Sequence, residues 1–484
     1  MHDMLNLTAL QLGRAIREGA VSVPEVTRMA LDAAQQDTHN CFITLTPEQA
    51  MLRAESLQQH LKEAESPLYG VPMAFKDNIC TRGIKTSCAS KMLVDFCPPY
   101  SAAAVELLAN AGAVSIGKTN MDEFAMGSTG ETSFFGPVNN PWNPAHSPGG
   151  SSSGSAAAVA SGIVPFALGS DTGGSVRQPA AHCGLTGIKP TYGTVSRYGL
   201  IAYASSLDQI GPLCRDAADC AAVLDVIQMY GRHDSTSLPG EYGRLLSCLS
   251  GDLRGVKIGL PMECFEDGLD GQVRRAVLAV ADVFRCRGAS VKEFHFPSQS
   301  YAVPAYYVLA CAEASSNLAR YDGVKYGYRA SGCSDLNELY CKTRTEGFGS
   351  EVKRRILLGT YVLSAGYYDA YYKKALQAKN MIRSAYQTAF EQFDLLLTPV
   401  SPTTAPKLGE HPDDPLQQYL GDVFTAGVNL AGLPALSMPC GFDGSGLPIG
   451  AQLIGPHLGE SAVLNAAHAF QLETDFHKSG RCGL

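Results

Sequence analysis

The clearest periodic pattern along the chain lies between residues 273 and 296. Apolar side chains spaced by four, three and four residues predict one face of a helix: Val273, Val277, Val280 and Phe284. The helix is expected to stop at Gly288, after which residues 290–296 alternate between polar and apolar side chains as a strand does. A helix followed at once by a strand favours an α/β fold.

The same succession of helix and strand occurs earlier in the chain. Residues 101–110 predict a helix of small residues closed by Gly112, and residues 113–116 predict the strand after it. Residues 8–60 are expected to be helical, with Thr8 as the N-cap. The remaining elements predicted are a helix at 217–229 and short buried strands at 69–76, 394–399, 434–441 and 450–455.

The length of 484 residues would allow two or three domains. No internal repeat and no long polar linker divides the sequence, so we expect one α/β domain over residues 1–484. Within it we distinguish a helical N-terminal region at about 1–65, a Gly/Ser-rich core at about 70–210 and a helical insertion at about 300–390.

Composition and charge exclude several classes of protein. The sequence is 45% hydrophobic and 17% charged, with a formal net charge of −8, which argues against autonomous nucleic-acid binding but not against contact with RNA through a partner. Its 15 cysteines are scattered, and no C-x-x-C pair or His/Cys cluster suggests a metal site. With no targeting or membrane-spanning pattern, we expect reduced cysteines and a cytoplasmic location.

A Gly/Ser-rich stretch at residues 147–162 has three possible interpretations. Glycine and serine are typical of flexible linkers, but residues 152–161 hold four alanines and a valine, which suit a packed helix. A phosphate loop is disfavoured because neither the Walker lysine nor a G-x-G-x-x-G pattern is present. The third interpretation is a catalytic site.

The turn after residues 164–171 supports the catalytic interpretation. Its motif DTGGS at residues 171–175 pairs two glycines with a serine. Adjacent glycines allow backbone N–H groups to converge on a developing oxyanion, and Ser175 directly follows them, as a nucleophile would. No histidine lies in a motif suited to a general base, and a structural or surface role is favoured for His146 and His182.

Lys76 is the leading candidate for the base. It ends an apolar strand, and burial of a lysine lowers its pKa enough for it to accept a proton. The alternative is an ordinary lysine at a strand end that reaches solvent. From these residues alone, a Ser/Lys hydrolase and a scaffold with structural Gly/Ser loops both remain open.

Three separated motifs resemble the amidase signature family: Lys76, GGSSSGS at residues 149–155 and DTGGSVR at residues 171–177. The resemblance implies a large mixed central β-sheet covered by helices on both faces. It also implies a Ser–cis-Ser–Lys triad in which Ser175 is the nucleophile, Ser151 the bridging serine after a cis peptide bond and Lys76 the base. The amides of residues 172–175, from Thr172, Gly173, Gly174 and Ser175, would form the oxyanion hole, and Asp171 and Arg177 would brace the turn.

Two positions depart from the family pattern. Ser153 stands where the family commonly has glycine, and residues 127–133 order their small side chains differently. We expect the first to be tolerated at a helix start. The loop 127–133 is expected to border the pocket, without individual contacts assigned.

Further resemblance, at residues 306–323, 351–356, 366–374 and 428–434, is to the glutaminase subunits of tRNA-dependent amidotransferases. It implies that Arg355 binds the α-carboxylate of glutamine, that Asp422 binds its α-amine and that Tyr306 lines the pocket. Two other interpretations stay open. Residues 353–355 could form a solvated helix face, and Asp422 could cap a helix over residues 423–429.

The partners implied by this resemblance are the B- and C-subunits of a heterotrimer. The B-subunit would use ATP and Mg²⁺ to phosphorylate mischarged Glu-tRNA(Gln) or Asp-tRNA(Asn), and would hold most of the tRNA contacts. The chain itself would need no cofactor or metal and would not contact a membrane. The alternative is a stand-alone amidase of the same family that acts on another small amide.

Overall fold

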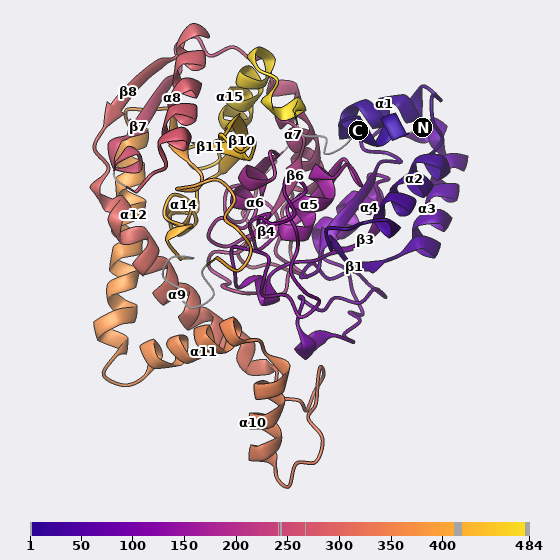
Figure 1. Ribbon diagram of the computed structural model, residues 1–484, viewed down its shortest axis with the longest axis vertical. Coiled ribbons are helices and arrows are strands. Elements are labelled where there is room, and N and C mark those ends of the chain that lie inside the picture. The colour runs from indigo at the N-terminus through magenta and orange to yellow at the C-terminus, as the bar shows by residue number, and fades with distance from the viewer. Residues whose placement is uncertain (1, 241, 243, 267, 411–418, 480–484) are drawn as a thin grey trace.

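The computed structural model describes residues 2–240, 242, 244–266, 268–410 and 419–479, and its centre is one 11-stranded sheet (Figure 1). The strands follow the order β1-β3-β2-β4-β6-β5-β10-β11-β9-β7-β8. Their bounds are β1 Phe42–Leu45, β2 Pro72–Lys76, β3 Val114–Thr119, β4 Phe166–Asp171, β5 Thr186–Lys189, β6 Gln209–Cys214, β7 Lys257–Pro261, β8 Ser290–Phe294, β9 Leu395–Pro399, β10 Ala435–Phe442 and β11 Pro448–Ile454.

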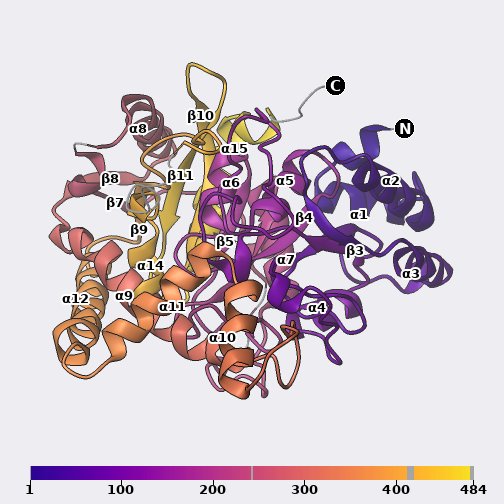
Figure 2. The ribbon, with the colours of Figure 1, turned by 60° about the horizontal axis from the view of Figure 1, so that its bottom comes forward.

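The sheet is mixed, as the family resemblance implied. Strands β3, β2 and β4 run parallel to one another, whereas β6 pairs antiparallel with both β4 and β5. Every residue of β2, β4 and β6 is buried, because helices cover the centre of the sheet on both faces (Figure 2). The expected α/β fold is therefore confirmed.

Helices surround this sheet at both ends and on both faces. Their bounds are α1 Ala9–Arg17, α2 Val23–Gln35, α3 Pro47–Gln59, α4 Ala103–Asn110, α5 Ser153–Ala160, α6 Arg177–His182, α7 Ala217–Ile227, α8 Gly271–Cys286, α9 Ala302–Asn317, α10 Leu336–Gly347, α11 Ser350–Leu363, α12 Lys373–Phe390, α14 Ala426–Ala431 and α15 Glu460–Glu473. In the part of the chain that the structure describes, no helix has the length and apolarity needed to cross a membrane.

The prediction of continuous helix over residues 8–60 is wrong in its middle. Thr8 caps α1 with a reciprocal capping box, as expected, but β1 interrupts the helices at Phe42–Leu45. This segment contains phenylalanine, isoleucine and threonine, which favour strands, and it pairs antiparallel with the edge of β3. The pairing partner lies more than seventy residues further along the chain, so helical periodicity alone misplaced the segment.

The predicted helix and strand around Gly288 are confirmed. Helix α8 begins after the Asp270 side chain, which accepts hydrogen bonds from two backbone N–H groups, and it buries the four predicted apolar side chains. Strand β8 ends at Phe294, two residues earlier than expected, because the amide of Phe296 donates to the Glu263 carboxylate at 2.7 Å.

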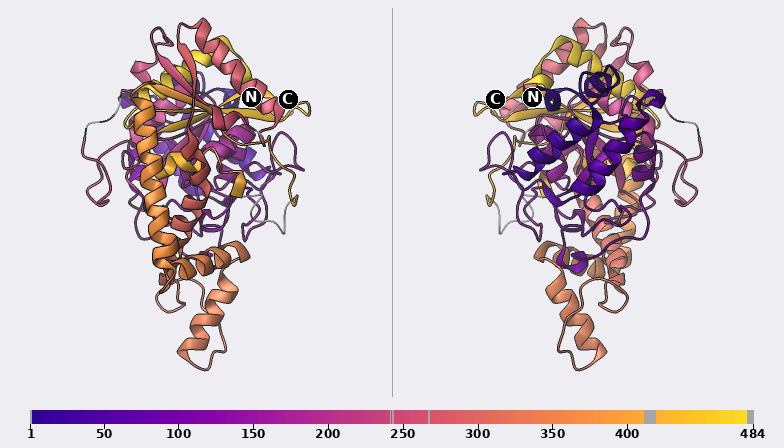
Figure 3. Two further views of the ribbon diagram at one scale, coloured as in Figure 1. Left: turned by 90° about the vertical axis from the view of Figure 1, so that its left-hand side faces the viewer. Right: turned by 90° about the vertical axis from the view of Figure 1, so that its right-hand side faces the viewer.

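The helical insertion predicted at about 300–390 forms a separate layer beside the sheet. Helices α11 and α12 both pack on α9, and α10 projects farthest from the sheet (Figures 1 and 3). Buried side chains of α9 and α11 join a second hydrophobic core that also contains parts of β9 and β10. The candidate site lies between this core and the centre of the sheet.

Candidate active site

Lys76 lies at the last position of β2, the third strand from one edge of the sheet, and its side chain is fully buried. Its Nζ atom lies 2.8 Å from Ser151 Oγ, 2.9 Å from Ser152 Oγ and 3.0 Å from Ser170 Oγ. The parallel neighbour β4 supplies Ser170, and the segment before α5 supplies the other two hydroxyls. The alternative of a strand-end lysine that reaches solvent is therefore wrong.

Burial changes the acidity of Lys76. It lowers the pKa of the amine from 10.5 to about 7, although the carboxylates of Asp122, Asp171 and Asp208 act in the opposite direction. A substantial fraction of Lys76 is therefore neutral near pH 7 and has a lone pair with which to accept a proton.

The stretch that contains Ser151 is rigidly built rather than a hinge. All residues from 147 to 160 are buried, and the peptide bond between Gly150 and Ser151 is cis, as the family resemblance implied. Only glycine fits at position 150, because a Cβ there would overlap the carboxylate of Asp122. The amide of Gly150 donates to Gln178 Oε1 at 3.2 Å. The linker interpretation is therefore wrong.

The helix that follows Ser151 packs closely on the sheet because its residues are small. A Cβ at Gly169 of β4 would lie 2.6 Å from Ser152 Oγ, so this glycine lets the start of α5 approach the strand. Ser153 opens α5, and its side chain is accommodated there, as expected. The small residues of α5 thus hold Ser151 against the end of β2.

The turn that carries Ser175 is organised by the carboxylate of Asp171, the last residue of β4. This carboxylate accepts hydrogen bonds from the amides of Gly174 at 2.9 Å and Val176 at 3.1 Å, and it forms a buried ion pair with Arg177 at 3.0 Å. Burial alone would raise the pKa of Asp171, but the Arg177 guanidinium holds it well below its usual range. Both residues brace the turn, as expected from the sequence.

The amides predicted to form an oxyanion hole differ in their availability. The Gly174 N–H already donates to Asp171, whereas the N–H groups of Thr172, Gly173 and Ser175 donate to no acceptor among the described residues. A Cβ at Gly173 would lie 2.5 Å from Cζ of Tyr306, so glycine is required there. Three of the four predicted donors can therefore serve an oxyanion without breaking a hydrogen bond.

Arg355 lies on the inner face of α11 with only 4% of its surface exposed. Its Nε donates to Glu351 Oε1 at 2.7 Å and its Nη1 to Tyr203 Oη at 2.7 Å. The rings of Tyr307 and Tyr419 lie 5.3 and 5.5 Å from its guanidinium carbon. The solvated-face interpretation is thus wrong for Arg355, which is a fixed buried cation.

Asp422 is a buried acid beside the same tyrosines. Its Oδ2 accepts a hydrogen bond from Tyr307 Oη at 2.7 Å, and burial raises its pKa to about 7. The alternative role as a helix cap is wrong, because α14 begins at Ala426 and no side chain caps it. The Asp422 carboxylate instead accepts the hydrogen bond of Tyr307, whose ring also faces Arg355.

Several polar residues around Arg355 and Asp422 were not predicted. Tyr203 and Glu351 orient the guanidinium, and Tyr307 orients the Asp422 carboxylate. Tyr306, which was predicted, lies at 3% exposure against Gly173. The only sequence signal for Tyr307 was its position directly after Tyr306, and nothing local distinguished Tyr203.

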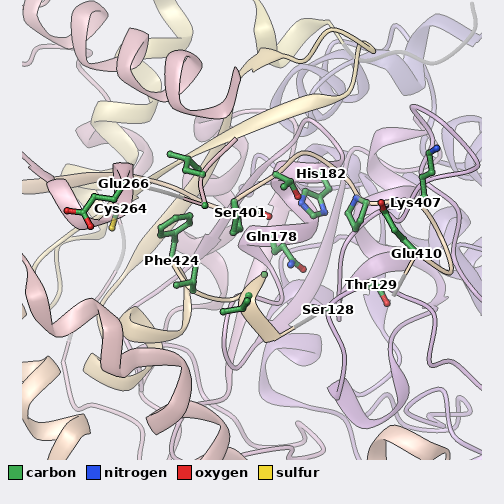
Figure 4. A pocket seen from close by; sticks show the side chains of 18 of the residues that line it. Ser128, Thr129, Gln178, His182, Cys264, Glu266, Ser401, Lys407, Glu410 and Phe424 are labelled. Carbon is green, nitrogen blue, oxygen red and sulfur yellow. Dashed lines mark hydrogen bonds between the residues drawn. The ribbon is translucent and has the colours of Figure 1, made fainter. Parts of the chain in front are cut away.

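A cavity of about 510 Å³ is lined by other described residues, and none of those predicted for catalysis or glutamine binding is among them (Figure 4). Ser128, Thr129 and Glu131 of loop 127–133 line it, whereas the border of this loop with the substrate pocket stays a prediction. Gln178, which holds Gly150, lines it too, as do Gly421 and Val423 on either side of Asp422. The cavity thus lies next to chain neighbours and hydrogen-bond partners of the predicted site residues, but not against those residues themselves.

The two histidines near the Gly-rich segment differ in their surroundings. His146 Nδ1 lies 2.7 Å from the Ala405 carbonyl oxygen, and burial lowers the pKa of His182, which lines the cavity, to about 4. Across the described ranges, no three His, Cys, Asp or Glu side chains are grouped as metal ligands would be.

The comparisons with known proteins begin with the family model described as Amidase, which matches residues 25–464. A protein of Agathobacter rectalis, named as the A-subunit of glutamyl-tRNA(Gln) amidotransferase, is 55% identical over 481 residues, which cover 99% of this chain and 96% of the relative. A protein of the same name in Neisseria meningitidis is 50% identical, and the alignment covers 98% of this chain and 99% of that relative.

Solved structures agree with the sequence comparison. The crystal structure of the A-subunit of glutamyl-tRNA(Gln) amidotransferase from Thermotoga maritima is 39% identical, has a TM-score of 0.80 and covers 97% of this chain and 95% of that one. A bacterial aryl acylamidase described as a member of the amidase signature enzymes shares the fold at a TM-score of 0.86, covers 98% of this chain and 99% of that one, and is 23% identical. The chain therefore belongs to the amidase signature family of enzymes.

Proposed function

We propose that this chain is the glutaminase subunit of a tRNA-dependent amidotransferase. The observation that carries the proposal is the buried contact of 2.8 Å between Lys76 Nζ and Ser151 Oγ, beside the turn with Ser175. A lysine with a pKa of about 7 supplies the base that a serine nucleophile needs. The names of the full-length relatives, at 50–55% identity, support the role as an amidotransferase subunit.

In the proposed reaction, Ser175 Oγ attacks the side-chain amide carbon of glutamine. The hydroxyl proton passes to Ser151, whose own proton passes to Lys76, and the carbonyl oxygen becomes an oxyanion held by the amides of Thr172, Gly173 and Ser175. When the C–N bond breaks, protonated Lys76 returns the proton through Ser151 to the leaving amine, which departs as ammonia. Water then attacks the γ-glutamyl ester, and the products are glutamate and free Ser175.

The proposed substrate is a zwitterion, which suits the guanidinium of Arg355 and the acidic side chain of Asp422 beside the turn. The Arg355 guanidinium would bind the α-carboxylate, and the Asp422 carboxylate would bind the α-amine. Tyr306 would line the space between them and the nucleophile. Glutamine carries both charges, whereas a simple amide carries neither, so this pair supports glutamine over the alternative of another small amide.

The proposed partners are the B- and C-subunits of the amidotransferase. Ammonia released here would reach the B-subunit, which would use ATP and Mg²⁺ to activate Glu-tRNA(Gln) or Asp-tRNA(Asn) and would choose between them. The C-subunit would hold the other two together. This role needs no cofactor in the present chain and belongs in the cytoplasm, where tRNA is charged.

The test is replacement of Ser175 by alanine in the assembled complex, with Ser445→Ala, in the exposed turn between β10 and β11, as the matched control. We expect Ser175→Ala to lower glutamine hydrolysis by about 10⁴-fold or more. Amidation of the mischarged tRNA with added ammonium salt as the nitrogen donor should persist. Ammonia release from glutamine at the rate of the control would contradict the proposal.

A second experiment distinguishes the proposed function from the alternative of a stand-alone amidase. That alternative predicts full hydrolysis of a simple amide by the isolated chain and no need for Arg355 or Asp422. The proposed function predicts preference for glutamine, stimulation by the B- and C-subunits with tRNA, and a loss of at least about 100-fold in kcat/KM when Arg355 is replaced by alanine.

A further inference from the structure

The peptide unit between Gly173 and Gly174 separates two of the free amides proposed for the oxyanion hole, those of Gly173 and Ser175. Gly174 has a φ of 142°, a conformation that L side chains rarely adopt, so local backbone preferences do little to hold this unit in one orientation. Side chains must therefore fix it if the two neighbouring amides are to keep their directions.

Both ends of this peptide unit are hydrogen bonded to buried side chains. Its N–H, on Gly174, donates to Asp171 Oδ1 at 2.9 Å, and its carbonyl oxygen, on Gly173, accepts from Thr425 Oγ1 at 2.5 Å. Thr425 has no exposed surface, and a Cβ on Gly174 would overlap its side chain. Since a peptide unit is planar, two hydrogen bonds at its opposite ends leave it little freedom to rotate.

Thr425 is itself fixed by the turn that carries Asp422. The amide of Thr425 donates to the Asp422 carbonyl at 3.1 Å, and the carbonyl of Thr425 accepts from Arg177 Nη1 at 3.2 Å. The hydroxyl also lies 3.3 Å from the Asp422 carbonyl. One short turn therefore contains both the Asp422 carboxylate, which is proposed to bind the substrate amine, and the Thr425 hydroxyl, which holds the carbonyl of Gly173.

We propose that Thr425 is a positioning residue for the oxyanion hole. By holding the carbonyl of Gly173, its hydroxyl sets the orientation of the peptide unit between the Gly173 and Ser175 amides. The substrate amine and the scissile carbonyl are thereby bound by parts of one connected structure. This inference rests on the proposed glutaminase function, because the amides it orients are those that would hold the oxyanion.

The test uses the complex with its partner subunits and compares four variants for glutamine hydrolysis. Thr425→Val keeps the shape but lacks the hydroxyl, Thr425→Ala removes the hydroxyl without adding bulk, and Thr425→Ser keeps the hydroxyl. The matched control is Thr27→Val in α2, since Thr27 is equally buried and its hydroxyl has no hydrogen-bond partner among the described residues.

We expect kcat to fall by about 10- to 100-fold in the Val and Ala variants of Thr425, less than on removal of an oxyanion donor itself, while KM stays within about threefold. Thr425→Ser and Thr27→Val should keep kcat within about threefold of wild type. A purely structural role predicts instead a lower melting temperature with unchanged kcat in the folded fraction.

Three contrary results are distinguishable. A wild-type complex that does not hydrolyse glutamine overturns the proposed function and this inference together. A wild-type complex that is active, with Thr425→Val and Thr425→Ala as fast as Thr27→Val, overturns the inference alone. A rise of KM with unchanged kcat would also overturn it, because it would assign Thr425 to substrate binding.

Discussion

Replacing Lys76 with methionine removes the amine from a fully buried position and leaves a side chain of similar length. In the folded protein, burial lowers the pKa of Lys76 from 10.5 to about 7, and in the unfolded chain it returns to about 10.5. This difference corresponds to about 5 kcal/mol against the charged amine in the folded state. The same burial that lowers the pKa of Lys76 therefore makes the fold less stable when the amine is charged.

The direction of the pH dependence of stability follows from the number of protons bound in the folded and unfolded states. Between pH 7 and 10.5 the unfolded chain keeps the Lys76 proton while the folded chain loses it, so the free energy of unfolding rises with pH in this window. From pH 7 to pH 9 this single group contributes a rise of about 2 kcal/mol. Lys76→Met lacks this contribution. Between pH 7 and pH 9, the free energy of unfolding of wild type should therefore rise by about 2 kcal/mol more than that of Lys76→Met.

The assay is urea unfolding of both proteins at pH 7, 8 and 9, followed by circular dichroism and extrapolated to zero denaturant. Lys62→Met, at an exposed position, controls for the exchange of lysine for methionine. Lost hydrogen bonds to Ser151, Ser152 and Ser170 shift the stability of Lys76→Met at all three pH values, so only the change with pH is compared. A difference between wild type and Lys76→Met that is constant from pH 7 to 9 would refute the lowered pKa.

Three further predictions concern glutamine hydrolysis by the assembled complex, measured by steady-state kinetics. Arg355→Lys should raise KM by about 100-fold, because an ammonium cannot reproduce the planar contacts with Tyr307 and Tyr419, and an unchanged KM would contradict this. Tyr307→Phe removes the hydrogen bond to Asp422 and should raise KM by about 10-fold with kcat nearly unchanged; a loss confined to kcat would count against it. The pH profile of kcat/KM should rise through about pH 7, since Lys76 must be neutral and Asp422 ionised; a profile flat from pH 6 to 8 would exclude both roles.

Many residues of the candidate active site could be predicted because they lie in short local sequence motifs. Gly150 and Gly173 are required by close approaches of Asp122 and Tyr306, so glycine at these positions marks the turns even before their neighbours are known. Lys76 was recognisable because a lysine at the end of an apolar strand must either reach solvent or be buried for a reason. The structure decided between these two outcomes.

The residues missed are those whose role depends on contacts between distant parts of the chain. Tyr203 meets Arg355 from a position 152 residues away, and Thr425 meets Gly173 from a position 252 residues away. A tyrosine or threonine in isolation has many ordinary structural uses, so neither stands out along the sequence. The short strand β1 was not predicted for the same reason, since its pairing with β3 is a tertiary contact.

The role of Ser175 as nucleophile can be tested by covalent labelling with an electrophilic analogue of glutamine, followed by mass spectrometry of the digested chain. We predict one equivalent of label on Ser175, protection by glutamine and loss of labelling in both Ser175→Ala and Lys76→Met. Because the analogue should bind in the glutamine site before it reacts with Ser175, the rate of labelling should saturate with analogue concentration. Label on a cysteine or on another serine, with Ser175 unmodified, would contradict the proposed glutaminase mechanism.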